Sequence, residues 1–163
     1  MVLLALAAEF RGPGALQLSA VHVNHGLSGN APAWEKFCVG HCDKLAVELR
    51  VARVSVDRAA AVGLEAAARA ARYDVFRCLD TDYVALAQHA DDQAETVLHQ
   101  ALRGTGLKGI AGMGATRQLP AGPVICRPLL AATRARLEAY AAARGLNWVE
   151  DESNEDTAYT RNF

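Results

Sequence analysis

A dense group of acid–base side chains lies in the middle of the chain, in the run His89-Ala90-Asp91-Asp92-Gln93-Ala94-Glu95. Carboxylates and a histidine together can move protons, hold a divalent cation or bind a donor-rich ligand. Because acids bind phosphate poorly, a role with phosphate requires Mg²⁺ as the bridge. The run predicts a nucleotide or metal site. Its structural alternative is a helix capping box formed by Asp92 and Glu95, which leaves His89 and Asp91 unexplained.

A second polar group, Asn24-His25-Gly26, follows the apolar, β-branched run Leu18–Asn24. Gly26 lets the backbone turn away at positive φ, so that Asn24 and His25 can point into a crevice. A histidine at a strand end is also a common hydrogen-bonded structural residue. Parallel strands would bring His25 and His89 to the same sheet edge, where open α/β sheets bind ligands.

A glycine-rich segment, Arg103-Gly104-Thr105-Gly106-Leu107-Lys108-Gly109, follows the acidic group. Mobile glycine loops that carry Arg and Lys suit closure over an anionic substrate. The alternative is a helix stop and a flexible connection. The segment is neither a GxGxxG turn nor a P-loop, because no strand precedes it and no Lys-Ser/Thr pair ends it.

The elements that would position these groups alternate between helix and strand. We predict helices over Met1–Phe10, Trp34–Leu49, Leu64–Leu79, Asp92–Arg103 and Thr133–Arg144, strands over Leu18–Asn24, Val51–Val56, Tyr83–Gln88 and 124–126, and a turn at Pro120–Pro123 between two short strands. Strands that alternate with helices of this length form βαβ units with a parallel sheet. The sequence therefore predicts one α/β domain over residues 1–163.

Composition excludes several classes of protein. With 52% hydrophobic residues in 163, the chain can bury a core, and the net charge of −1 gives no general attraction to nucleic acid. The four cysteines form no CxxC pair, so we expect reduced thiols. Met1–Phe10 is too short to cross a bilayer and has no basic leader, so we expect no membrane contact and a cytoplasmic location.

Several motifs, in their order along the chain, resemble one family. The motifs are HVNHGL, EAAAR followed by Arg72-Tyr73, QHADDQAET, LRGTGLKGIAGM, RPLL, and DESN followed by Arg161-Asn162. This set is similar to the N-terminal catalytic domain of bacterial tRNA(Ile)-lysidine synthetases, a group of the PP-loop (N-type) ATP pyrophosphatases. The resemblance implies a parallel-sheet, adenine-nucleotide hydrolase-like fold that uses ATP and Mg²⁺.

The same resemblance implies substrates and residue roles. Members of the family join L-lysine to C2 of the wobble cytidine of a tRNA(Ile) with a CAU anticodon, through an adenylated tRNA intermediate. By this resemblance, the ATP side would be lined by Asn24, His25, Gly26, His89 and Asp92, and catalysis would use Asp91, Asp92 and Glu95. The metal ligands would be Asp91 and Glu95, and the tRNA or lysine contacts would come from Arg103, Lys108, Asp151, Asn154 and Arg161.

One family motif, the pyrophosphate-binding SGGxDS loop, does not occur in the chain. We therefore expect a truncated domain that lacks its first strand and binds pyrophosphate weakly. Three alternatives stay open: a 2-thiocytidine synthetase, which the lack of CxxC pairs disfavours, a metal-dependent phosphohydrolase, and an inactive nucleotide-binding fragment. A homodimer is a further possibility that the sequence leaves open.

Overall fold

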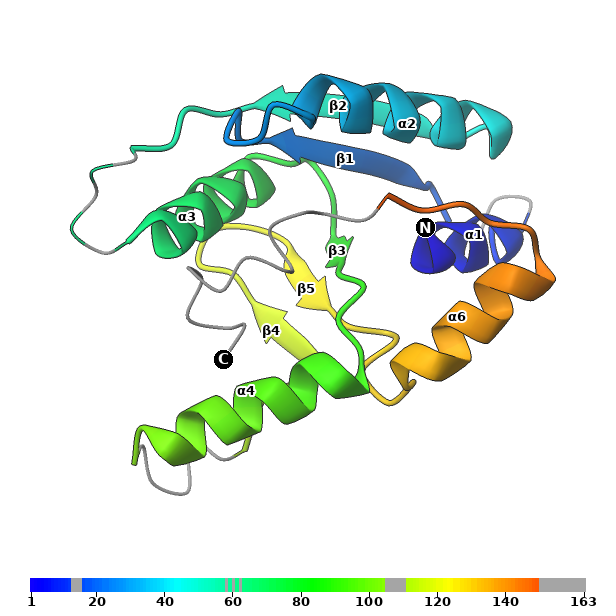
Figure 1. Ribbon diagram of the computed structural model, residues 1–163. Helices are drawn as coiled ribbons and strands as arrows, with labels where there is room; N and C mark the ends of the chain where they lie inside the picture. Colours follow the sequence, from blue (N-terminus) through cyan, green and yellow to red (C-terminus); the bar gives the residue numbers. More distant parts are fainter. Residues whose placement is uncertain (13–15, 58, 60, 62, 105–110, 150–163) are drawn as a thin grey trace.

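The computed structural model of the chain describes residues 1–12, 16–57, 59, 61, 63–104 and 111–149. Helices and strands alternate along most of it (Figure 1). The elements are α1 (Val2–Glu9), β1 (Ser19–Asn24), α2 (Ala31–Lys44), β2 (Glu48–Arg53), α3 (Leu64–Arg77), β3 (Tyr83–Ala85), α4 (Ala90–Leu102), β4 (Thr116–Gln118), β5 (Val124–Cys126) and α6 (Arg134–Ala143). The predicted α/β class is confirmed.

The strands form two groups rather than one continuous sheet. β1 and β2 pair in parallel, from Ser19 opposite Glu48 to Asn24 opposite Arg53. β3 and β5 also pair in parallel, and β4 adds an antiparallel edge to β5. Among the described residues β1 and β3 belong to different sheets and are not paired with each other. The expected parallel pairing is therefore present, but in two parts.

Side chains join the two strand groups. The main cluster of buried residues consists of Tyr73, Phe76, Val84, Leu119 and Ile125, and Ile125 has no exposed surface. Val21 and Val23 of β1 pack against this cluster from the other sheet. Burial of this apolar surface, rather than strand pairing, connects β1 to β3.

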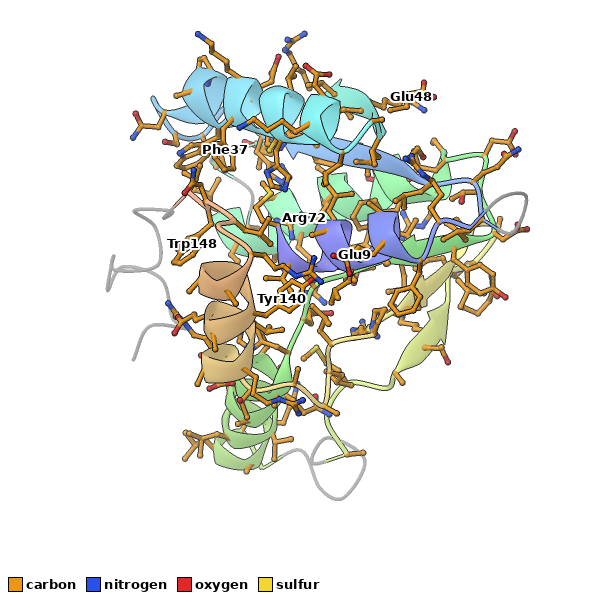
Figure 2. All side chains as sticks on the ribbon, turned by 90° about the vertical axis from the view of Figure 1, so that its right-hand side faces the viewer. Glu9, Phe37, Glu48, Arg72, Tyr140 and Trp148 are labelled. Atoms are coloured by element: carbon orange, nitrogen blue, oxygen red, sulfur yellow. The ribbon has the colours of Figure 1, made fainter. Side chains whose placement is uncertain are left out.

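The first and last described helices pack together. Tyr140 Oη on α6 lies 3.3 Å from Glu9 Oε1 on α1, and Arg144 Nη1 lies 2.7 Å from the same carboxylate oxygen. Figure 2 shows Glu9 and Tyr140 side by side at this contact. The contact gives the apolar α1 a polar anchor on its last turn.

Several predicted boundaries are wrong. α2 ends at Lys44 and β2 begins at Glu48, three residues before the predicted strand start at Val51, because the chain turns at Ala46 with a φ of 49°. α4 begins at Ala90, two residues before the predicted start at Asp92. β3 ends at Ala85, which leaves residues 86–89 as an extended connection rather than strand.

The four cysteines are free thiols, as predicted: Cys38, Cys42, Cys78 and Cys126. Burial is the largest cause that raises the pKa of Cys38, Cys42 and Cys126. In the part of the chain that the structure describes, no helix is both long enough and apolar enough to cross a membrane.

Candidate active site

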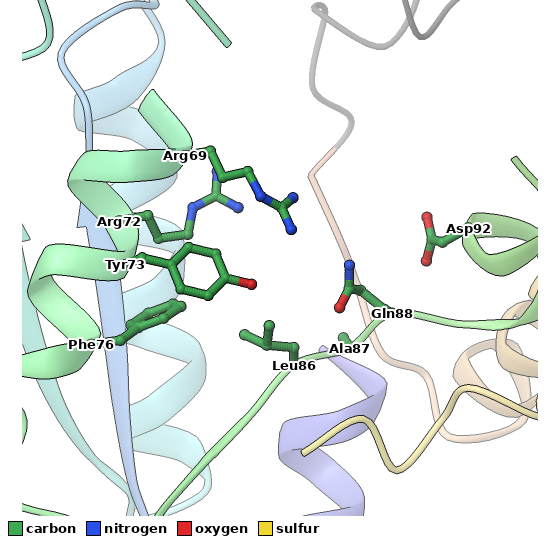
Figure 3. A pocket seen from close by; sticks show the side chains of 8 residues that line it. All are labelled: Arg69, Arg72, Tyr73, Phe76, Leu86, Ala87, Gln88 and Asp92. Carbon is green, nitrogen blue, oxygen red and sulfur yellow. The ribbon is translucent and has the colours of Figure 1, made fainter. Parts of the chain in front are cut away.

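A cavity of about 250 Å³ opens where the chain leaves β3 (Figure 3). One wall comes from α3, the floor from residues 86–88, and the far wall from the start of α4. The lining residues are Arg69, Arg72, Tyr73, Phe76, Leu86, Ala87, Gln88 and Asp92. The cavity therefore combines two guanidinium groups, one carboxylate and an apolar floor at the carboxyl end of a parallel strand, the usual ligand position in this class of fold.

The α3 wall follows from helical spacing. Arg69, Tyr73 and Phe76 recur at intervals of four and three residues, which places them on one face of the helix. The Arg69 guanidinium lies 5.3 Å from the centroid of the Tyr73 ring, and Arg117 of β4 lies 5.8 Å from the same centroid. This cation–π arrangement holds positive charge beside the cavity.

The far wall is the first turn of α4. His89 is the N-cap, and Asp92 Oδ2 accepts a hydrogen bond of 2.8 Å from the His89 backbone N–H. The Nδ1 atom of His89 lies 3.5 Å from the same oxygen. The structural alternative, a capping box between Asp92 and Glu95, is wrong by one turn, because the helix starts earlier: His89 is the N-cap and Asp92 is the third residue of the helix.

Asp91 connects two helix N-termini. Its Oδ2 atom accepts a 2.8 Å hydrogen bond from the backbone N–H of Arg134, the first residue of α6. The Ala90 N–H in turn donates to the carbonyl of Ala132 at 2.8 Å. Figure 1 shows the two helices starting beside each other. A carboxylate at this place is stabilised by the positive ends of both helix dipoles.

Residues after the glycine-rich segment are tied to the cavity wall. The Gln93 side chain donates to the Met113 carbonyl at 3.0 Å and accepts from the Met113 N–H at 2.7 Å. Gly112 has a φ of +66°, and a Cβ there would lie 2.8 Å from the Gln93 amide. A side chain at Gly112 would therefore both strain the backbone and displace this double contact.

The end of β1 presents a different arrangement. Asn24 Oδ1 accepts from the Gly26 N–H at 2.9 Å, and Asn24 Nδ2 donates to Glu35 Oε2 at 3.2 Å. Gly26 has the predicted positive φ, +63°. Both polar atoms of Asn24 are thus engaged within the protein, so this side chain shapes the turn that carries His25.

His25 has two buried ring nitrogens, and neither has a hydrogen-bond partner. Burial lowers the pKa of His25, and the positive charge of Arg72 and neighbouring His22 lower it further. The ring is therefore held neutral, with one donor and one acceptor unused. Arg72 therefore acts electrostatically on His25 at the end of β1, and it lines the same cavity as Asp92 of α4.

Mg²⁺ in proteins is commonly held by one or two carboxylates together with substrate phosphates and waters. Asp91 and Glu95 stand one helical turn apart on α4, and both are exposed. They fit such a shared site. Within the described residues no group of three or more His, Cys, Asp or Glu side chains is placed to hold a metal by itself.

The remaining predicted contacts lie further away or outside the described residues. Arg103 is the exposed C-cap of α4. Lys108, Asp151, Asn154 and Arg161 fall outside the part of the chain that the structure describes. Sequence reasoning did not select Arg69 or Gln88 as site residues. The helical spacing of Arg69, Tyr73 and Phe76 could have indicated Arg69.

A comparison with known families decides the group to which this chain belongs. The PP-loop domain family matches residues 1–163. The chain is a member of the PP-loop domain family. Its cavity at the end of β3 is therefore a feature of a PP-loop domain, and the resemblance read from the motifs is confirmed at the level of this family.

Curated relatives of this PP-loop domain include tRNA(Ile)-lysidine synthases. The one from Chromobacterium violaceum is 52% identical over 164 residues, with 100% of the chain and 38% of the relative covered. Those from Nitrosomonas europaea and Pseudomonas aeruginosa are 47% and 51% identical, with 36% and 37% of the relative covered. The chain thus spans between a third and two fifths of the length of these relatives.

The fold has a similar solved structure. The U34-tRNA thiolase of Methanococcus maripaludis, solved with its 4Fe–4S cluster, superposes with a TM-score of 0.77 at 18% sequence identity. The match covers 91% of this PP-loop domain and 54% of the thiolase chain. At this identity the likeness concerns the fold alone.

Proposed function

We propose that this PP-loop domain carries the ATP-dependent chemistry of lysidine formation on the wobble cytidine of a tRNA(Ile) with a CAU anticodon. The observation that supports it most strongly is identity of about half over the whole chain to three tRNA(Ile)-lysidine synthases. The cavity between α3 and α4 is the proposed reaction site, because it combines cationic, acidic and apolar groups at one strand end.

The proposed reaction has two steps. The oxygen at C2 of cytidine attacks the α-phosphorus of ATP, and pyrophosphate leaves. An amine of free L-lysine then attacks C2, loses a proton, and AMP leaves with the C2 oxygen. Negative charge develops on phosphoryl oxygens in the first step, and fixed cations lower its energy. Mg²⁺, when bound through Asp91 and Glu95, would supply additional positive charge.

The chain's own residues have proposed parts in these steps. Arg69 and Arg72 stabilise the phosphoryl oxygens from the α3 wall, and neutral His25 binds a donor or acceptor of the nucleotide. Asp92 faces them and receives the proton that the lysine amine loses. Arg103, Lys108, Asp151, Asn154 and Arg161 are proposed to contact tRNA or lysine. These reactants are those of the cytoplasm, where we propose the protein acts.

A chimaera tests the proposal. The segment of the Chromobacterium violaceum relative that matches this chain is replaced by residues 1–163, and the product is incubated with ATP, Mg²⁺, L-lysine and tRNA(Ile). We expect lysidine in the nuclease digest by mass spectrometry, and AMP in equal amount. A folded chimaera that binds ATP but forms no lysidine would contradict the function.

Two of the open alternatives make different demands on side chains. A 2-thiocytidine synthetase and a metal-dependent phosphohydrolase both require clustered metal ligands, which the described residues do not supply. Sulfur in the modified nucleoside, or phosphate release without tRNA, would favour these alternatives in the same assay. A homodimer and an inactive nucleotide-binding fragment stay untested.

A further inference from the structure

Gln88 stands at the centre of a hydrogen-bond network that fixes the direction of its side-chain amide. Arg127 Nε donates to Gln88 Oε1, and Arg127 Nη1 donates to the Gly114 carbonyl at 2.8 Å. Arg127 is only 6% exposed and is the charged residue that is buried in the described structure. Because a guanidinium can only donate, the Gln88 oxygen must face it, and the Gln88 nitrogen must face away.

The nitrogen of Gln88 is therefore placed at the cavity wall. One of its two N–H groups points to Met113 Sδ at 3.1 Å. Gln88 lines the cavity opposite Arg69 and Tyr73 (Figure 3). A primary amide has two donor hydrogens, so the second N–H is available to a ligand in the cavity.

The buried charge of Arg127 adds to this effect. None of the ion pairs among the described residues includes Arg127, so its charge is met by neutral acceptors alone. A cation hydrogen-bonded to an amide oxygen polarises that amide and strengthens its N–H as a donor. The wall at Gln88 is thus specific for a hydrogen-bond acceptor.

We propose that Gln88 is a specificity-determining residue that donates a hydrogen bond to an acceptor oxygen of the substrate, with Arg127 as the positioning residue that orients it. The inference rests on the proposed function and goes further, because it names the group that is recognised. Two sources supply such an oxygen: a phosphoryl group of ATP, or the carbonyl at C2 of the cytosine ring.

The test compares four variants with the original full chain. Gln88→Leu removes donor and acceptor, and Gln88→Glu keeps the acceptor for Arg127 but cannot donate. Gln88→His, as a neutral imidazole, keeps one acceptor and one donor. Affinity is measured by titration with two probes, ATP with Mg²⁺ and cytidine, and folding is checked by thermal unfolding. Gln100→Leu, on α4 and not among the residues that line the cavity, is the matched control.

For the probe that Gln88 recognises, we expect roughly tenfold or greater weakening in Gln88→Leu and Gln88→Glu, and affinity close to the original in Gln88→His and Gln100→Leu. The unfolding temperature of Gln88→Glu should be at least that of the original chain, because the introduced carboxylate pairs with Arg127. Weakening for ATP alone assigns the phosphoryl oxygen, and weakening for cytidine alone assigns the carbonyl.

Equal affinities in all folded variants, or no binding of either probe by the original chain, would overturn the inference. Loss of affinity in Gln88→His equal to that in Gln88→Leu would also overturn it, because a shape effect would then suffice. These results are distinct from failure of the proposed function, in which Gln88 variants differ in affinity as expected but the chimaera forms no lysidine.

Discussion

The ends of β1 and β3 carry similar residue types and use them differently. At the end of β1, Asn24 bonds the turn through Oδ1 and Glu35 of α2 through Nδ2, and the neighbouring His25 has two buried ring nitrogens without partners. At the end of β3, Asp91 and Asp92 each give one carboxylate oxygen to a helix N-terminus, and Gln88 keeps a donor directed to the cavity.

The comparison shows that composition alone does not identify the reactive group. At each strand end some polar side chains hold the backbone, and another is proposed to bind a ligand. In both regions the holding residue follows from local spacing, as in the Asn24 turn and the His89–Asp92 cap. The residue proposed to bind a ligand depends on side chains that are distant in sequence. The charge of Arg72 acts on His25, and a hydrogen bond from Arg127 orients Gln88.

The largest effect on activity should come from changes at Asp92, which both caps α4 and lines the cavity. Asp92→Asn can still accept from the His89 N–H but loses the charge, so lysidine formation by the chimaera should fall by roughly 100-fold with little change in stability. Asp92→Ala should also lose about 1 kcal/mol of stability, because the helix end loses its cap. Mass spectrometry and urea unfolding measure the two effects. Asp74→Asn, which changes an exposed acid on α3, is the control. Full activity in Asp92→Asn would show that Asp92 has only a structural role.

Arg127→Met should have the next effect, on stability at the β3 end. It leaves the Gln88 oxygen and the Gly114 carbonyl without their donor, at a cost of roughly 1–3 kcal/mol in the free energy of unfolding. Hydrogen exchange should quicken in residues 112–118 and stay unchanged in β1. Equal quickening in β1 would show that the two regions unfold as one unit. Arg144→Met, which removes an exposed ion pair with Glu9, should cost less than about 1 kcal/mol.

A smaller effect is expected at the β1 end. The hydrogen bond from Asn24 is the largest cause that lowers the pKa of Glu35, with the Arg53 hydrogen bond next. Asn24→Ala and Asn24→Asp should both raise the pKa of Glu35, and NMR titration of its carboxyl carbon measures this. Only Asn24→Ala should also loosen the turn at Gly26, because an aspartate oxygen can still accept from that N–H. An unchanged Glu35 pKa in both variants would contradict the assignment.

The smallest expected effect is a dependence of stability on pH that arises from His25. Burial and Arg72 lower the pKa of His25 in the folded state, so the unfolded state binds more protons near the ordinary histidine value. Stability should therefore fall as the pH drops below about 6.5 and level off below the folded-state pKa. Arg72→Met should raise the pKa of His25 toward its usual value, as followed by NMR of the imidazole. An unchanged pKa of His25 would contradict this and place Arg72 away from the ring.

Much of the fold could be predicted from the sequence because its signals are local. The helix over Leu64–Arg77 and the strand over Ser19–Asn24 follow from local residue types, and Thr133 caps α6 through its side chain. The boundary at Ala46 could not be predicted, because an alanine with positive φ has no sequence signal. The early start of α4 depends on the carbonyl of Ala132, about forty residues away.

The candidate site was harder to predict. The sequence singled out His25, Asp91 and Asp92 as polar groups that follow strands; of these Asp92 lines the cavity, and their roles toward a ligand stay predictions. The contact of Asp91 with the start of α6, and the partnership of Gln88 with Arg127, depend on contacts across 43 and 39 residues. Sequence spacing carries no information at that separation, so these roles required the three-dimensional arrangement.

Hydrogen exchange with and without ATP and Mg²⁺ tests most directly whether both strand ends serve one ligand. The account predicts slower exchange in residues 24–27 and 86–92 together, with the amides of α1 and the last turns of α6 unaffected. Slower exchange at one strand end alone, or at neither, would contradict it.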